Sequence, residues 1–401
     1  MDKRVRNLFL SLALLSLVGL FSFKMGQSSV KAEISKSGKL DLSLMWKVKD
    51  KLATMYLDKK DIDEEKMSYG AIEGMVASLG DPYTVFLPPS DNKAANEDLA
   101  GEFGGVGISL GYKDETLAVM SPLAKTPAEK AGVMAGDLIL KIIDKENNID
   151  KDTNGISLDE AVKLIRGKVG TTVTLKMYRE SKSEPFEVNL VRDNIVVPSI
   201  ELEWKESEGK QVAWVKLYKF TDRLFEEWPE MVDEINAKKG SDFGGIVLDL
   251  RNNPGGYLQA SVLVASDFIK EGTVVTQESS DGSKEVYKVE KSRGKLLNDK
   301  LVVLINGGSA SASEILAGAL RDHQRATLVG EKSFGKGTVQ QPDNFSDGSG
   351  IHITIARWLL PSGKNIHKEG VEPEVKVVFE RDENNLEKDN QLDKAIEVLL
   401  K

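Results

Sequence analysis

The sequence predicts a mixed α/β protein of several domains, and three observations lead to this fold class. The length of 401 residues exceeds what one hydrophobic core usually organises. From about residue 195 onward, strand and helix patterns alternate along the chain, which is typical of an α/β core. Residues 101–192 instead form a β-rich stretch around one amphipathic helix, and residues 41–78 show helical periodicity.

The composition is that of a folded soluble protein and excludes several classes of function. Hydrophobic residues make up 40% and charged residues 29% of the chain. The 54 basic and 63 acidic residues give a net charge of −9 with both signs interspersed, which argues against a nucleic-acid partner. Because cysteine is absent, a disulfide framework, a thiol nucleophile and a cysteine-ligated metal are excluded.

The first element, residues 1–24, has the pattern of an export signal. Lys3, Arg4 and Arg6 precede an uncharged apolar run at 8–23. This run is shorter than the roughly 20 residues that span a bilayer, but polar flanks can extend it, so a cleaved signal peptide and a membrane anchor both remain open. In either case the bulk of the chain is expected outside the cytoplasm, in the cell envelope or periplasm.

A polar linker at 25–40 leads into a helical region predicted for residues 41–100. The apolar positions expected on its two helices are Leu44, Met45, Val48 and Leu52, followed by Ala71, Ile72, Met75 and Val76. These faces are either a contact in a homo-oligomer or an ordinary part of the fold. The segment 80–90 is rich in turn residues and is predicted to end the helical run.

Residues 101–192 are predicted to form a self-contained domain that opens with Phe-Gly-Gly-Val-Gly-Ile at 103–108. The expected elements are a short helix, a turn and a strand at 128–142, an amphipathic helix at 157–167, and a strand at 171–178. Ser157 and Glu160 form a capping box at the start of this helix, and Gly167 is expected to end it.

Residues 193–378 are predicted to form the α/β core. Its expected strands are 211–220, 244–250, 301–306 and 351–360, and its expected helices are 222–239, 257–269 and 311–323. The first of these helices is expected to bury Leu224, Phe225, Trp228, Val232 and Ile235. A charged tail and a short helix at 393–401 complete the chain in the predicted segment 379–401.

Three serines stand at the turn between the strand at 301–306 and the helix that follows it: Ser309, Ser311 and Ser313. A hydroxyl presented at a helix N-terminus lies near free backbone N–H groups that can stabilise an oxyanion. The same pattern also fits a serine that only caps the helix.

A serine nucleophile needs a base, and the three histidines, His323, His352 and His367, lack the acidic arrangement of a triad. Lys336, between Gly335 and Gly337, is the alternative, because burial lowers the pKa of a lysine. Gln340 could orient its neutral amine. A lysine in a surface turn is the simpler interpretation of the same residues.

Two further segments contain glycines and resemble known functional loops. Residues 249–256, Asp-Leu-Arg-Asn-Asn-Pro-Gly-Gly, follow a buried strand and could turn backbone N–H groups inward as an oxyanion hole, or form a plain turn. Residues 330–336 match the start of a phosphate-binding loop, but Gly337 stands where that motif needs Ser or Thr, which excludes nucleotide binding.

In their order along the chain, these segments resemble the carboxyl-terminal processing peptidases, an exported family with a serine–lysine dyad and tail-specific activity. The resemblance runs from about residue 56 to 375, and Ser333 replaces the family's threonine. It implies a crotonase-like α/β core that needs no cofactor and no metal. The residue roles it implies are Ser311 as nucleophile, Lys336 as base, Gln340 as its orienting partner, and backbone N–H groups of Ala312 and of either Gly255 or Gly256 as the oxyanion hole.

The unit at 101–192 resembles the PDZ domain of the same family. The resemblance implies that Gly105, Val106, Gly107 and Ile108 receive a peptide's C-terminal carboxylate while the peptide adds to the sheet edge. Arg166 either couples peptide binding to the active site or is a cation at a helix C-terminus. The expected function is a serine endopeptidase acting on polypeptides with a free C-terminus.

Two rival functions share these features. A PDZ-type scaffold that has lost catalysis would not need the set Ser311, Lys336 and Gln340. An acyl-CoA-type enzyme would share the core fold, but export and the PDZ-like unit argue against it, and fold alone does not establish activity.

Overall fold

The structure is a computed structural model that describes residues 41–291, 293–380 and 388–401. The chain divides into two compact units, residues 1–71 and 72–401, which are described separately. The predicted export signal and the linker at 25–40 lie outside the described residues, as does part of the charged tail. Within the described ranges, no helix has both the length and the apolar character needed to cross a membrane.

The described part of the first unit is helical, as predicted. It contains α2 (Ser43–Met55), the short 3₁₀ helix η1 (Lys59–Asp61) and the start of α3 (Glu64–Ala77). None of the α2 side chains is buried, and Leu44 is 69% exposed. The apolar side chains expected on α2 therefore face solvent in the single chain.

The turn-rich segment at 80–90 forms more structure than its composition indicated. Residues Val85–Leu87 make strand β1, which pairs with β18 (Gly350–Leu359), and Pro89 begins helix α4 (Pro89–Ala100). Helix α4 has proline in its first turn and ends at Gly101, whose φ of +75° suits a left-handed cap. The helical run ends before this segment, at Ala77, as predicted, but β1 was not predicted because this strand depends on a partner far along the chain.

The stretch from 101 to about 196 folds around its own hydrophobic cluster, which includes Val106, Ile139, Ala161 and Leu175. Its helices are α5 (Pro127–Lys130) and α6 (Leu158–Ile165). The strands are β2 (Glu102–Gly105), β3 (Ile108–Lys113), β4 (Thr116–Pro122), β5 (Leu138–Asp144), β6 (Ile149–Asp152), β7 (Thr172–Tyr178), β8 (Phe186–Val191) and β9 (Asp193–Val196). The main sheet has the order β3-β4-β5-β7-β8, so β3 is an edge strand.

The helix, turn and strand patterns predicted in this stretch are confirmed. Ser157 Oγ accepts a hydrogen bond from the Glu160 backbone N–H at 3.2 Å, which fixes the start of α6. The helix ends at Ile165, with Arg166 as its C-cap, rather than at Gly167.

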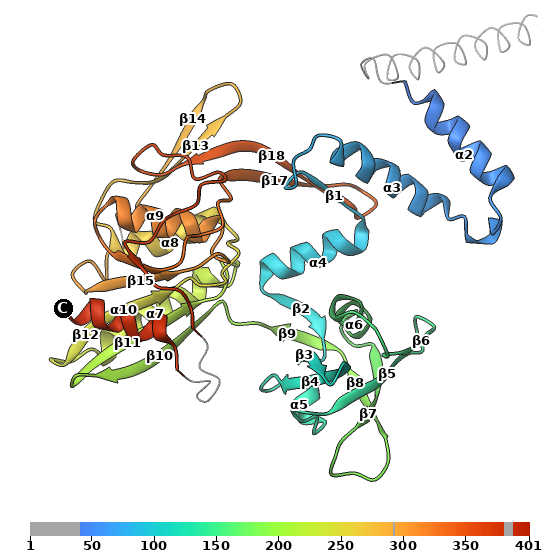
Figure 1. The fold of residues 1–401 in the computed structure, drawn as a ribbon, viewed down its shortest axis with the longest axis horizontal. Coiled ribbons are helices and arrows are strands. Elements are labelled where there is room, and N and C mark those ends of the chain that lie inside the picture. Colours follow the sequence, from blue (N-terminus) through green and yellow to red (C-terminus); the bar gives the residue numbers. More distant parts are fainter. Residues whose placement is uncertain (1–40, 292, 381–387) are drawn as a thin grey trace, which may run out of the picture. The chain divides into compact units, whose positions relative to one another are not determined.

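The core is a six-stranded sheet of order β10-β11-β12-β15-β16-β19, of which β10, β11, β12 and β15 are labelled in Figure 1. Its strands are β10 (Ile200–Ser207), β11 (Lys210–Leu217), β12 (Phe243–Asp249), β15 (Leu301–Ile305), β16 (Thr327–Gly330) and β19 (Val375–Lys376). Strands β11, β12, β15, β16 and β19 run parallel, so their carboxyl ends share one edge. Functional residues gather at that edge in open α/β sheets.

Both faces of this sheet are covered by helices. One face packs against α7 (Leu224–Lys238), α8 (Leu258–Phe268) and α9 (Ala312–Asp322). The other packs against α10 (Asn390–Leu400), through residues such as Leu392 and Leu399. The prediction for α7 was wrong at Phe225, which is 40% exposed, while Leu224, Trp228, Val232 and Ile235 are buried.

A second sheet lies in the same unit, with the order β1-β18-β13-β14 and β17 paired to β18. It contains β13 (Thr273–Ser279), β14 (Lys284–Lys288), β17 (Thr338–Asn344) and β18. Strand β17 begins two residues after Lys336 and carries Gln340, so this sheet holds the candidate base and its partner. The predicted mixed α/β class is confirmed.

Candidate active site

The turn between β15 and α9 presents Ser311 at the start of the helix. Ser311 is the N-cap residue of α9, with φ +56° and ψ −115°, a conformation that residues other than glycine rarely adopt. The hydroxyls of the two neighbouring serines are occupied, because Ser309 Oγ donates to Leu250 O at 2.7 Å and Ser313 Oγ donates to Asn253 O at 2.9 Å. Of the three serines, Ser311 alone lines the cavity described below.

Glu314 connects the segment of Ser311 with the segment of Lys336. Its side chain is fully buried. Its Oε2 accepts the backbone N–H of Ser311 at 2.9 Å and that of Lys336 at 2.8 Å. Its Oε1 accepts the Ser333 hydroxyl at 2.6 Å and the Gly335 N–H at 2.7 Å. One carboxylate thus fixes the backbones of the two candidate dyad residues relative to each other.

The side chain of Lys336 is largely removed from water. Burial lowers the pKa of Lys336 below its ordinary value, while the negative charges of Asp81 and Glu314 act in the opposite direction. The Nζ atom lies 5.1 Å from the centroid of the Tyr83 ring. A lowered pKa is the direction that a lysine acting as a base requires.

Gln340 stands on β17 with both amide hydrogens engaged. Its Nε2 donates to Thr338 Oγ1 at 2.9 Å and to Thr354 Oγ1 at 3.1 Å. The amide oxygen is therefore the group left to accept a hydrogen bond from an amine. Among the described residues, no hydrogen bond joins the side chains of Ser311, Lys336 and Gln340, although all three line one cavity.

The loop at 249–256 passes directly behind Ser311. A Cβ atom at Gly255 would lie 2.8 Å from Ser311 Cβ and 3.0 Å from the Ala312 nitrogen, so only glycine permits this approach. The buried Asn253 holds the loop, since its Oδ1 accepts the Gly255 N–H at 2.9 Å and its Nδ2 donates to Leu217 O at 2.7 Å. The predicted oxyanion segment and the predicted nucleophile are thereby brought together.

The same loop is anchored to the C-terminal helix by Arg251. Its guanidinium group contacts Asp249 at 2.6 Å and Asp389, the N-cap residue of α10, at 2.7 Å. It also donates to Gln391 Oε1 at 3.1 Å. This network fixes the base of the loop on the sheet.

The candidate catalytic residues open onto one cavity of about 780 Å³. Its lining includes the polar residues Ser311, Lys336 and Gln340 together with Gly255 and Gly256, and its apolar walls include Leu258, Val339, Ile355 and Trp358. A cavity of this size and character suits a segment of polypeptide. Within the described ranges, no group of His, Cys, Asp and Glu side chains could hold a metal ion.

Comparison with known proteins decides the family. Residues 211–377 match the profile of Peptidase family S41, residues 104–190 that of the PDZ domain, and residues 22–90 that of the activating protease CtpB N-terminal domain. The carboxy-terminal processing protease CtpA of Bacillus subtilis (strain 168) is 36% identical over 353 residues, which cover 88% of this chain and 71% of the relative. The chain belongs to the carboxy-terminal processing proteases of family S41. It is a serine peptidase by that membership.

Two further comparisons agree with this assignment. The carboxyl-terminal-processing protease of Synechocystis sp. (strain ATCC 27184 / PCC 6803 / Kazusa) is 39% identical, covering 79% of this protease and 72% of the relative. The structure of the photosystem II D1 C-terminal processing protease superposes with a TM-score of 0.51 at 31% identity, covering 88% and 90% of the two chains.

Two residues of the site were absent from the expectations drawn from the sequence. Glu314 stands three positions after Ser311, and this Ser-x-x-Glu spacing of a capping box was an available signal. Tyr83 lies in the segment predicted as a plain turn, and no local pattern places it beside Lys336.

The predicted peptide-binding residues of the protease lie in the PDZ domain, and none of them is among the residues that line the catalytic cavity. Gly107 has φ +77°, and a Cβ atom there would lie 2.3 Å from Thr126. Val106 is buried, and its carbonyl accepts the Ala128 N–H at 2.9 Å. The loop of Gly105, Val106 and Gly107 is thereby held at the start of the edge strand β3, which begins with Ile108.

Arg166 of the protease packs on an aromatic ring beside this loop. Its guanidinium carbon lies 3.7 Å from the centroid of the Phe103 ring.

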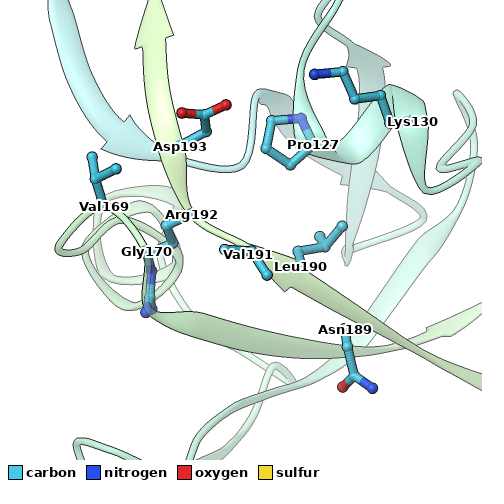
Figure 2. Close-up of a pocket in the computed structure, with 9 residues that line it drawn as sticks. All are labelled: Pro127, Lys130, Val169, Gly170, Asn189, Leu190, Val191, Arg192 and Asp193. Atoms are coloured by element: carbon cyan, nitrogen blue, oxygen red, sulfur yellow. The ribbon is translucent and has the colours of Figure 1, made fainter.

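Figure 2 shows a pocket of the PDZ domain, of about 420 Å³, which contains none of the predicted peptide-binding residues. Its lining is Pro127, Lys130, Val169, Gly170, Asn189, Leu190, Val191, Arg192 and Asp193.

Proposed function

We propose that this protein is an exported serine endopeptidase that cleaves polypeptides from or near a free C-terminus, with Ser311 as nucleophile and Lys336 as general base. The observation that carries the proposal is the Glu314 carboxylate, because a single oxygen accepts the backbone N–H groups of both residues. Ser311, at a helix N-terminus, and Lys336, whose amine is partly removed from water, line one cavity.

The proposed reaction is acyl transfer. The neutral amine of Lys336 takes the proton of the Ser311 hydroxyl while the serine oxygen attacks the scissile carbonyl carbon. The resulting tetrahedral intermediate collapses when Lys336 returns the proton to the leaving amine, which releases the C-terminal fragment. Water then hydrolyses the acyl-enzyme by the same proton route. Gln340 orients the amine through its amide oxygen.

The oxyanion would be held by two backbone N–H groups. The Ala312 N–H belongs to the first residue of α9, where the helix dipole adds to the stabilisation. The Gly255 N–H already donates to Asn253 Oδ1, which favours Gly256 as the second donor. The close approach of Gly255 to Ala312 brings this loop beside the first residue of α9.

The PDZ domain would select the substrate by its C-terminus. A carboxylate would be received by the N–H groups of the loop formed by Gly105, Val106, Gly107 and Ile108, and the peptide would extend β3 at its free edge. Arg166, stacked on Phe103 beside this loop, is placed to respond when the loop is occupied.

We also propose an extracytoplasmic location, because three basic residues precede the apolar run at 8–23 in the manner of an export signal. Whether that run is cleaved or anchors the chain does not alter the chemistry. The exposed apolar side chains of α2, including Leu44 and Leu52, support self-association into a homo-oligomer.

One experiment tests the proposed activity. The purified full chain is incubated with an unfolded polypeptide that ends in apolar residues, offered with either a free or an amidated C-terminus. We expect cleavage of the free form, weaker cleavage of the amidated form, and loss of cleavage in Ser311→Ala and in Lys336→Ala. Lys332→Ala is the matched control, because Lys332 is a half-exposed lysine of the same segment that pairs with Glu372.

Retention of activity in both variants would exclude the dyad. Binding of the free-ended polypeptide without cleavage by the unaltered chain would instead favour a peptide-binding scaffold.

A further inference from the structure

The segment Asp81–Thr84, here called the arm, precedes β1 and is fixed to the sheet that carries the candidate base. Within the arm, Asp81 Oδ1 accepts the Tyr83 N–H at 3.0 Å and Asp81 Oδ2 accepts the Thr84 hydroxyl at 2.7 Å. Thr84 Oγ1 in turn accepts the backbone N–H of Thr354 on β18 at 3.0 Å. The side chain of Thr84 is almost fully buried. The arm therefore has one defined position on β18.

This position places Tyr83 against the amine of Lys336. The Nζ atom lies 5.1 Å from the ring centroid, within the range of a cation–π contact. On its other side, the Tyr83 ring meets His367 edge to face, with centroids 6.4 Å apart. Pro82 and Tyr83 line the same cavity as Ser311 and Lys336. The ring is thus a wall of the catalytic cavity contributed from more than 200 residues earlier in the chain.

The arm is also linked to Gln340, the proposed partner of Lys336. Thr354 connects the arm to Gln340, because its N–H donates to Thr84 and its Oγ1 accepts from Gln340 Nε2 at 3.1 Å. A displacement of the arm would therefore disturb both Tyr83 and Gln340. The arm and Gln340 therefore belong to one hydrogen-bonded network, and the ring of Tyr83 is the part of the arm that contacts Lys336.

We propose that Tyr83 is a positioning residue of the protease, whose ring covers the amine of Lys336 and excludes water from it. This inference depends on the proposed role of Lys336 as the base. The Asp81–Thr84 hydrogen bonds hold the ring in place, and Asp81 is the residue that fixes the turn.

The charges around the amine explain why such a cover is needed. Asp81 of the arm and Glu314 of α9 both favour the ammonium form of Lys336, while burial and the nearby charge of Lys336 lower the pKa of His352 on β18. The face of an aromatic ring also attracts a cation, so the ring by its charge distribution would raise the pKa. Burial outweighs these effects, since the net direction of the pKa shift is downward. Exclusion of water is therefore the contribution that we assign to Tyr83.

Three substitutions of Tyr83 separate these effects. Tyr83→Phe keeps the ring, Tyr83→Leu keeps an apolar cover without a π face, and Tyr83→Ala opens the amine to water. We expect the acidic limb of the pH profile of kcat/KM to move up by about one pH unit in Tyr83→Ala, because a hydrated ammonium has the higher pKa. The limb should stay in place in Tyr83→Phe, and in Tyr83→Leu it should stay or move slightly down, because the π face that attracts the ammonium is lost.

The pKa of the amine is measured in parallel without relying on activity. Each Tyr83 variant is combined with Ser311→Ala in the full chain, and the pH dependence of acetylation of Lys336 is followed by mass spectrometry. Tyr287→Ala is the matched control, since Tyr287 is an aromatic residue on the wall of the same cavity that makes no ring contact with Lys336 among the described residues. The labelling midpoint should rise in Tyr83→Ala and stay constant in the control.

An unchanged labelling midpoint in Tyr83→Ala would overturn the inference, as would an equal rise in Tyr83→Leu. These results are distinct from failure of the proposed dyad, which would appear as activity retained in Lys336→Ala while the labelling midpoints still responded to Tyr83.

Discussion

The PDZ domain and the protease core each bury a charged side chain beside their predicted site, but they satisfy it in different ways. In the PDZ domain, Arg192 pairs with Asp144 at 2.9 Å, and both side chains are 1% exposed. Arg192 also donates to the carbonyls of Leu164 and Ile165 at the end of α6. In the core, none of the ion pairs among the described residues involves Glu314, whose carboxylate is held by three backbone N–H groups and one hydroxyl.

The difference shows what each buried charge is for. Arg192 and Asp144 neutralise each other, and Arg192 fixes the end of α6. The Glu314 carboxylate is held by neutral donors and does not need Lys336 as a counter-ion. If Lys336 were paired directly with Glu314, its amine would be held as ammonium and could not act as a base.

The largest expected effect follows from replacing Glu314. In Glu314→Gln, an NH₂ group replaces one of the acceptor oxygens, so buried N–H groups lose their hydrogen-bond acceptor. Each such loss is expected to lower the free energy of unfolding by about 1–3 kcal/mol. We expect kcat to fall on the order of 100-fold, because small displacements of a catalytic pair have effects of this size. Cleavage kinetics at saturating substrate measure this change.

Ser333→Ala is the matched control for Glu314, since it removes one hydrogen bond to the same carboxylate and none to a dyad residue. A smaller loss of kcat in this variant is expected. Equal losses would mean that Glu314 serves general packing of the segment, not placement of the dyad.

The next effect concerns the charged pair of the PDZ domain. Arg192→Met leaves Asp144 buried without its cation, which is expected to lower the free energy of unfolding by about 3–5 kcal/mol. Calorimetry of the full chain measures this loss, and kcat per folded molecule should not change. The double variant Arg192→Met, Asp144→Asn should recover part of the stability. A loss of kcat comparable to that of Glu314→Gln would remove the distinction between the two regions.

The smallest effect is expected at the ion pair that joins the 249–256 loop to α10. Burial tends to raise the pKa of Asp389, but hydrogen bonds from Arg251 and from backbone N–H groups hold it below the ordinary value. A carboxyl with a lowered folded-state pKa stabilises the fold above its unfolded-state pKa, and this contribution is lost as pH falls through the folded value.

Asp389→Asn should therefore lower the free energy of unfolding at neutral pH by about 1–2 kcal/mol. The difference in Tm between the two proteins should shrink as the pH is lowered below about 4, where the wild-type carboxyl becomes protonated. Thermal unfolding at a series of pH values measures both. A difference that stays constant down to strongly acidic pH would contradict the assigned pairing.

The parts of the fold that the sequence predicted well depend on neighbouring residues. The capping hydroxyl of Ser157 and the alternation at 171–178 are local patterns, and the structure contains both elements. Strand β1 was not predicted from the sequence, because its pairing with β18 stabilises it. Phe225 was misplaced because it lies one residue, or about 100° of helix rotation, from the buried Leu224.

The candidate site divides in the same way. Ser311 and Lys336 could be nominated from small residues at a turn and from flanking glycines, and their assigned roles remain predictions. The spacing of Ser311 and Glu314 was a local signal for the bond between them. The contacts of Glu314 and of Tyr83 with the segment of Lys336 could not be predicted, because they exist only once segments distant in the chain meet. No spacing rule links Tyr83 to a lysine more than 200 positions later.

The shared oxygen of Glu314 has a consequence for how the protease would be turned on. With both backbone N–H groups bonded to one carboxylate oxygen, a displacement of either main chain would disturb the hydrogen bond to the other. The side chains of Ser311 and Lys336 keep their rotatable bonds. Bringing the amine to the hydroxyl would then be a change of side-chain rotamer, with an entropy cost on the order of 2 kcal/mol for ordering a lysine.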